Sequence, residues 1–78
     1  MEELFYVAED LGLKKGTDFE SKVENLSATF TFTDKQKGNL LRDEFMKRYA
    51  DGMINVSYIT NLKKSAISDK YSFKITIQ

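Results

Sequence analysis

The segment "LSATFTFTD", Leu26 to Asp34, decides the fold, because it alternates between two kinds of side chain before the chain becomes charged. Successive side chains of an extended strand point to opposite faces. One face would carry Leu26, Ala28, Phe30 and Phe32, and the other Ser27, Thr29, Thr31 and Thr33. The pattern therefore predicts a strand with one face on a hydrophobic core and the other face in solvent.

A helix is predicted directly after this strand, over residues 35–51. Asp34 is a favourable N-cap, and "DG" at residues 51–52 offers a glycine where helices commonly end. The apolar stripe of this helix consists of Gly38, Leu41, Phe45 and Tyr49. Glycine inside a helix costs about 1 kcal/mol relative to alanine. Its place on the stripe therefore indicates a close approach of helix and sheet.

Two further strands are predicted, in "MINVSYIT" (residues 53–60) and "YSFKITIQ" (residues 71–78). Alternation in the first places Ile54, Val56 and Tyr58 on the core side, and Asn55, Ser57 and Ile59 on the other side. The last segment alternates most regularly, with Tyr71, Phe73, Ile75 and Ile77 on its apolar face. Residues 61–70 are predicted to form a loop, so the two strands make a hairpin.

The N-terminal segment "EELFYVAEDLG", residues 2–12, is predicted to be a helix. Leu4, Val7, Ala8 and Leu11 have helical spacing, acidic residues occupy the first turn, and Gly12 can end the helix. A short strand through "LFYVA" is the alternative, since that run is rich in β-forming residues. Residues 14–22 are predicted to form a loop, with Phe19 on the core.

These elements predict a two-layer α+β sandwich in the order α-β-α-β-β. Its sheet has three strands and is mainly antiparallel, built as a split βαβ unit plus a hairpin. The last strand lies between the other two, and the helices cover one face only. A chain of 78 residues has room for one core, so residues 1–78 are expected to form a single domain.

Composition favours a soluble cytoplasmic protein. The chain is 41% hydrophobic, lacks cysteine, and has no apolar run of about 18 residues that could span a membrane. Its formal net charge is zero, but residues 1–24 carry seven acidic and three basic residues, and residues 25–78 carry five and nine. The favoured interpretation is that the two parts complement each other within the fold. An electrostatic partner surface is the alternative.

The side chains argue against an enzyme. With neither histidine nor cysteine, the commonest general base, the thiol nucleophile and the usual zinc and haem ligands are missing. The acidic pairs at residues 9–10 and 43–44 point about 100° apart on a helix and do not converge on one ion. No glycine-rich phosphate loop is present. No catalytic residue, metal or cofactor is therefore expected.

Docking on another protein is the favoured function. The open sheet face and the edges "LSATFTFT" or "MINVSYIT" could receive a partner, because neither strand contains proline. The candidate protein-binding residues are Thr29, Thr31, Asn55, Ser57 and Ile59. Brevity, the lack of His, Cys and Pro, and the α+β plan resemble small phage-encoded accessory proteins that bind a host or viral macromolecule. That resemblance implies an adaptor or inhibitor.

Nucleic-acid binding is the alternative, through the basic doublets Lys47–Arg48 and Lys63–Lys64. Against it, the predicted open face carries one lysine and no aromatic side chain for base stacking, and the pI is near 6.2. A homodimer formed through sheet edges or open faces is a third interpretation.

Overall fold

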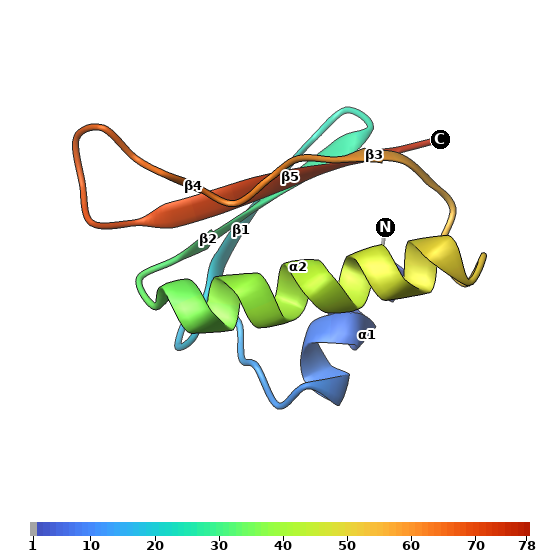
Figure 1. The fold of residues 1–78 in the computed structure, drawn as a ribbon, viewed down its shortest axis with the longest axis horizontal. Coiled ribbons are helices and arrows are strands. Elements are labelled where there is room, and N and C mark those ends of the chain that lie inside the picture. The colour runs from blue at the N-terminus through green and yellow to red at the C-terminus, as the bar shows by residue number, and fades with distance from the viewer. Residues whose placement is uncertain (1) are drawn as a thin grey trace.

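The computed structural model describes residues 2–78, which form two helices on one side of an antiparallel sheet (Figure 1). The helices are α1 (Glu2–Asp10) and α2 (Lys35–Ala50). The strands are β1 (Glu20–Glu24), β2 (Ser27–Phe32), β3 (Val56–Ile59), β4 (Lys63–Lys64) and β5 (Tyr71–Ile77). The α+β class, the antiparallel sheet and the single helical layer agree with the sequence prediction. The N-terminal helix is confirmed in place of the alternative strand, but it ends at Asp10, and residues 11–12 form a turn.

The strand order is β1-β2-β5-β3, with β4 paired to β5 beyond the end of β3, and every pairing is antiparallel. The last strand therefore lies between β2 and β3, as expected. The predicted order α-β-α-β-β and the count of three strands were wrong. The expected loop at residues 14–22 contains the start of β1, and the expected loop at residues 61–70 contains β4.

Strand β1 forms a hairpin with β2, and its weak apolar content explains why the sequence pattern missed it. Its sequence is ESKVE, which contains one apolar residue. It lies at the edge of the sheet and pairs with β2 alone. Charges on an edge strand discourage pairing with other chains. Asn25 makes the turn with a φ of 51°, a left-handed conformation that asparagine tolerates better than most residues. The Ser27 hydroxyl donates to the carbonyl of Glu24 at 3.1 Å.

The ends of α2 follow from its flanking residues. The Asp34 carboxylate accepts hydrogen bonds from the backbone N–H groups of Gln36 at 2.8 Å and Lys37 at 3.4 Å, which caps the N-terminus. At the other end Gly52 has a φ of 73°, and the N–H of Met53 donates to the carbonyl of Arg48 at 2.8 Å.

The core lies between the two layers and is centred on Phe30. Its ring contacts Phe45 and Phe73 with centroids 5.4 Å away, and Phe5 and Phe19 lie at 5.8 and 5.7 Å. The N-terminal segment adds buried side chains from α1 and the following loop, namely Leu4, Val7, Ala8, Leu13 and Phe19. Tyr49, which was expected in the core, is 44% exposed in the last turn of α2.

The segment between β3 and β4 lies close to α2. The sequence predicted a close approach of this helix at Gly38, and the structure shows that Leu62 of this segment is one of its neighbours there. A Cβ atom on Gly38 would lie only 3.1 Å from the Leu62 side chain and 3.3 Å from the Phe32 ring. Arg42 holds the same segment, because its Nε donates to the carbonyl of Thr60 at 2.6 Å and its Nη2 to Asn61 Oδ1 at 3.0 Å. Residues 60–62, which make these contacts, belong to neither strand, and the Thr60 carbonyl is hydrogen-bonded to α2 instead of to the sheet.

Ion pairs join the acidic N-terminal segment to α2. Asp10 contacts Arg48 at 3.0 Å, and Asp18 contacts Lys37 at 2.8 Å. Part of the charge asymmetry is thus internally matched, in agreement with the favoured interpretation. Within residues 2–78, neither helix is both long and apolar enough to cross a bilayer.

Candidate interaction surface on the sheet

Among residues 2–78, the sheet face opposite the two helices has no element over it (Figure 1). Three rows of cross-strand neighbours build this face. Paired residues share a face, so the pairing register identifies each row. From β1 outward, the rows are Glu24–Ser27–Thr76–Tyr58, Lys22–Thr29–Lys74 and Glu20–Thr31–Ser72–Lys63. We call this surface the outer face. It is polar, with hydroxyl groups in the middle and charged groups toward both edges.

Tyr58 is the exposed aromatic residue of the outer face, and the sequence pattern placed it in the core. Val56 pairs with Ile77 and Tyr58 with Thr76, so two steps along β3 match one step along β5. This bulge leaves Ser57 as an extra residue and moves Tyr58 to the outer face. The Tyr58 side chain is 63% exposed. Period-two reasoning cannot detect such a shift, because the sequence carries no local mark of it.

Ile59 was predicted to be an exposed protein-binding residue, and this was wrong. After the bulge it pairs with Ile75 on the helix-covered face and is 8% exposed. Ser57 is exposed, and its hydroxyl donates to the carbonyl of Thr76 at 3.3 Å. Asn55 is exposed just before β3, where its carbonyl accepts from the N–H of Gln78 at 3.4 Å.

Thr29 and Thr31 lie on the outer face, as predicted, but not on an edge. They are half-buried, because β1 lies on one side of β2 and β5 on the other. The expectation that "LSATFTFT" forms a free edge was therefore wrong. Their hydroxyl-bearing side chains form the middle of the outer face instead, while β3 is one of the two outermost strands.

The charges of the outer face differ between its two edges. On β1, Lys22 and Glu24 contact each other at 2.7 Å. Their hydrogen bond raises the pKa of the Lys22 ammonium group and lowers the pKa of the Glu24 carboxyl group. Toward the opposite edge lie Lys63 on β4 and Lys74 on β5, both exposed. One side of the face is thus mixed in charge, and the other is basic.

The two basic doublets of the sequence are not brought together. Lys47 and Arg48 occupy the last turn of α2, whereas Lys63 and Lys64 form β4 near the opposite end of the sheet (Figure 1). Arg48 is held by Glu44 at 2.8 Å and by Asp10. Lys64 lies 3.8 Å from Asp69 at an exposed position. Of the four, Lys63 lies on the outer face, opposite Ser72.

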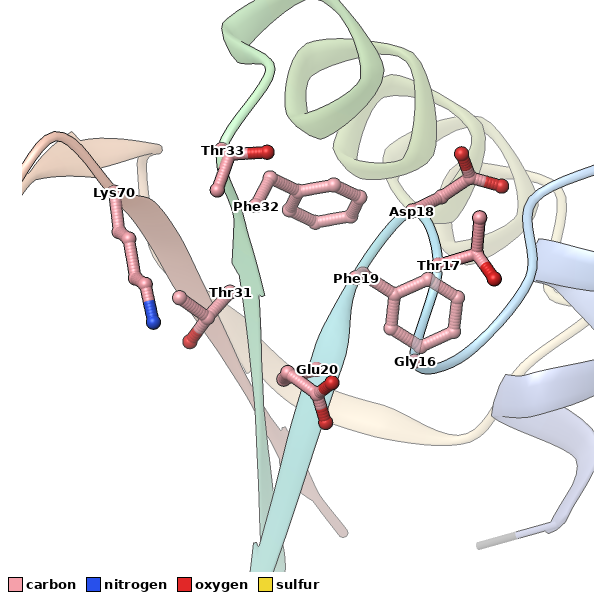
Figure 2. A pocket seen from close by; sticks show the side chains of 9 residues that line it. All are labelled: Gly16, Thr17, Asp18, Phe19, Glu20, Thr31, Phe32, Thr33 and Lys70. Atoms are coloured by element: carbon pink, nitrogen blue, oxygen red, sulfur yellow. The ribbon is translucent and has the colours of Figure 1, made fainter.

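A pocket of about 200 Å³ opens beside the outer face, where β1 begins and β2 ends (Figure 2). Phe19 and Phe32 line its apolar part, and the polar lining comes from Thr17, Asp18, Glu20, Thr31, Thr33 and Lys70. Figure 2 shows Lys70 and Thr31 on the side of β2 away from the Phe32 ring, which places Lys70 beside the outer face.

Asp18 is the acidic residue of this pocket whose carboxylate accepts two hydrogen bonds from the rest of the fold. It accepts from the Lys37 ammonium group at 2.8 Å and from the backbone N–H of Lys14 at 2.8 Å. The hydrogen bond from Lys37, followed by that from Lys14, lowers the pKa of the Asp18 carboxyl group. Since Asp18 is engaged in the fold, we interpret it as structural. In the part of the chain that the structure describes, no cluster of three His, Cys, Asp or Glu residues could hold a metal ion.

A second cavity of about 370 Å³ lies between α1 and the loop that follows it. Its apolar lining consists of Phe5, Ala8, Leu13 and Phe19, and its polar rim of Glu9, Lys14 and Lys15. The Lys15 ammonium group lies 5.7 Å from the centre of the Phe5 ring, within the range of a cation–π contact. This cavity is on the helical side of the molecule.

Comparisons of the chain with protein-family models, with characterised proteins and with solved structures returned no match.

Proposed function

We propose that this protein acts without catalysis, by docking its outer face on another protein. The observation that supports the proposal is the position of Tyr58, which is 63% exposed on the sheet face opposite both helices of the described residues (Figure 1). Tyrosine is enriched at protein interfaces, because it has a large apolar ring and a polar hydroxyl group. The threonine and serine hydroxyls around it can both donate and accept hydrogen bonds.

A docking role also agrees with the absence of catalytic chemistry in the sequence. The chain contains neither histidine nor cysteine. Binding needs only a complementary surface, whereas acid–base or nucleophilic catalysis needs a positioned reactive group. We therefore propose an adaptor or an inhibitor, which occupies a surface on its partner.

Capture from a nuclease-treated native lysate tests this proposal. Thr29→Glu places a carboxylate in the middle of the outer face, between its cross-strand neighbours Lys22 and Lys74, whose opposite charges favour it. We expect this variant to lose partner capture while keeping its circular dichroism spectrum. Asn39→Glu, at an exposed position on α2, adds the same charge to the helical side and should capture normally. Equal capture by both variants would contradict docking through the outer face.

Nucleic-acid binding is the second candidate, and the presence of both Tyr58 and Lys63 on the outer face favours it. An exposed aromatic ring can stack on a base while a lysine contacts phosphate. In this case capture would depend on intact nucleic acid and fall as salt rises. Lys63→Glu/Lys64→Glu should then abolish binding to single-stranded DNA or RNA. Capture that persists after nuclease treatment would exclude it as the main function.

Self-association is the remaining alternative. A homodimer formed through the outer face would appear in sedimentation at several concentrations and would be weakened by Thr29→Glu. A protein that sediments as a monomer throughout and captures a partner would exclude it.

A further inference from the structure

We propose that the docking partner presents an acidic segment to the basic side of the outer face. This inference rests on the proposed function and adds the chemistry of the partner. The recognising groups are Lys63, Lys70 and Lys74, which we call the basic row, with Tyr58 at its end.

The basic row follows β5 along one side of the outer face. Lys74 is two residues from Ser72, and Lys63 lies opposite Ser72 on β4. Lys70 comes just before β5, and its carbonyl accepts from the N–H of Ser65 at 2.8 Å. Because a strand advances about 3.4 Å per residue, these positions follow each other at steps of about 7 Å. One more step leads to Thr76, which faces Tyr58.

The positive charges of the basic row are only weakly matched within residues 2–78. Lys22 chiefly lowers the pKa of the Glu24 carboxyl group, and Lys74 adds to this effect from beyond ion-pair distance. Among residues 2–78, none of its three ammonium groups lies within ion-pair distance of a carboxylate. The nearby acidic residues have other partners, since Asp69 faces Lys64 and Glu24 faces Lys22.

On α2, Lys37 and Arg48 are paired, whereas Lys35 and Lys47 are exposed and, like the basic row, form no ion pair in the described part of the chain. The basic row differs from those two lysines in its position on the uncovered sheet face. Three cations without an ion-pair partner, placed together on the uncovered face, form a surface that an acidic segment of a partner would complement.

An acidic protein segment fits this surface better than a nucleic acid does. The same face carries Glu20 and Glu24 on β1, and these carboxylates would repel a phosphate backbone that crossed the whole sheet. Strands that bind bases usually present several aromatic rings, whereas Tyr58 is the one aromatic residue in the three rows. A protein segment can place acidic side chains against the basic row and an apolar side chain against Tyr58.

Three labelled probes test the inference: a peptide of alternating glutamate and leucine, its lysine–leucine counterpart, and single-stranded DNA of matched length. Binding is measured by fluorescence anisotropy at low and high salt, and amide chemical shifts locate each contact. Lys63→Glu/Lys74→Glu reverses two of the three charges of the basic row and leaves Lys70. Lys35→Glu/Lys47→Glu, at exposed positions on α2, changes the net charge equally and is the matched control.

We expect the glutamate–leucine peptide to bind at β3, β4 and β5, and to lose affinity about tenfold or more in Lys63→Glu/Lys74→Glu. The control variant should lose less than about threefold, because its charges lie on the other layer. No binding, or equal loss in both variants, would overturn the inference. Tighter binding of DNA would assign the row to phosphate and overturn it too. The peptide result can contradict this inference while Thr29→Glu still abolishes lysate capture, so failure of the inference is distinguishable from failure of the proposed function.

Discussion

Tyr58 and Ile59 are consecutive residues with opposite environments, and the bulge in β3 is the cause. Tyr58 lies on the outer face, and Ile59 lies on the core. Without the bulge, the alternation that begins at Val56 would bury Tyr58 and expose Ile59. The position of the aromatic ring on the docking surface therefore depends on the local register of one strand.

Alanine substitutions at these two positions should give opposite results. Ile59→Ala removes buried methyl groups and should lower the free energy of unfolding by about 2–4 kcal/mol. Tyr58→Ala should lower it by less than about 1 kcal/mol, because the ring is mostly exposed, yet it should reduce partner capture. Urea denaturation measures the stabilities, and each variant serves as the control for the other. A larger loss of stability for Tyr58→Ala would contradict the observed register.

Gly38 allows α2 to approach Leu62, and a double-mutant cycle tests this contact. Gly38→Ala improves helix propensity by about 1 kcal/mol but crowds the Leu62 side chain, whose nearest carbon would lie 3.1 Å from the new Cβ. We expect the two effects nearly to cancel in the natural sequence. In a Leu62→Ala background, Gly38→Ala should stabilise by about 0.5–1 kcal/mol. Additive effects would show that Leu62 does not limit this position.

At the scale of elements, Arg42 connects α2 to the edge formed by β3 and β4. Arg42→Met keeps the aliphatic part of the side chain but removes both hydrogen bonds to residues 60–61. We expect a loss of about 1–2 kcal/mol in the free energy of unfolding. Amide hydrogen exchange should also become faster at Thr60, whose N–H donates to the carbonyl of Lys74, and at Lys74, whose N–H donates to the Thr60 hydroxyl. Lys47→Met, on the exposed side of α2, is the control. Unchanged exchange in Arg42→Met would contradict the anchoring role.

Regular periodicity predicts some of these elements well. β2 and β5 alternate without interruption, and α2 has both a capping aspartate and a terminal glycine, so their positions follow from the sequence. β1 was missed because its ESKVE sequence has little apolar content, and tertiary pairing with β2 supplies what local propensity lacks. β4 spans two residues, too few for any pattern.

The candidate surface could also be predicted only in part, because alternation identifies the exposed residues of a regular strand but not those of a strand with a bulge. Thr29, Thr31 and the one lysine predicted for the open face, which is Lys74, do lie on the outer face, because they belong to strands with unbroken alternation. Tyr58 and Ile59 exchanged faces because of a bulge, which the sequence does not reveal. The charged residues of β1 were not predicted on this face, because residues 14–22, which include the start of β1, were expected to form a loop.

At the scale of the whole molecule, Asp18 links the N-terminal segment to α2 and should make stability depend on pH. Its carboxyl pKa is lowered in the folded state from an ordinary value of 3.8, chiefly by Lys37. The group therefore stabilises the fold above the unfolded-state pKa, and this contribution is lost as the pH falls through the folded-state pKa.

Asp18→Asn should consequently be less stable than the natural protein at neutral pH and should lose less stability between neutral pH and about pH 3. Urea denaturation across this range measures both effects. Lys37→Met removes the main cause of the pKa shift and should weaken the acid dependence in the same direction. Glu24, whose pKa is lowered by Lys22, keeps part of the dependence in both variants. Acid dependence equal to that of the natural protein in Asp18→Asn would contradict this role.

The molecule has two sides, the outer face of the sheet and the helical layer, and each carries at least one exposed tyrosine. Tyr58 lies on the outer face, whereas Tyr6 and Tyr49 lie on α1 and α2, with exposed fractions of 63%, 57% and 44%. Hydroxyl-radical footprinting of the protein alone and with its captured partner is the most direct test of docking through the sheet. We predict that the partner protects Tyr58 and leaves Tyr6 and Tyr49 reactive. Protection of Tyr6 or Tyr49 while Tyr58 stays reactive would contradict docking through the outer face.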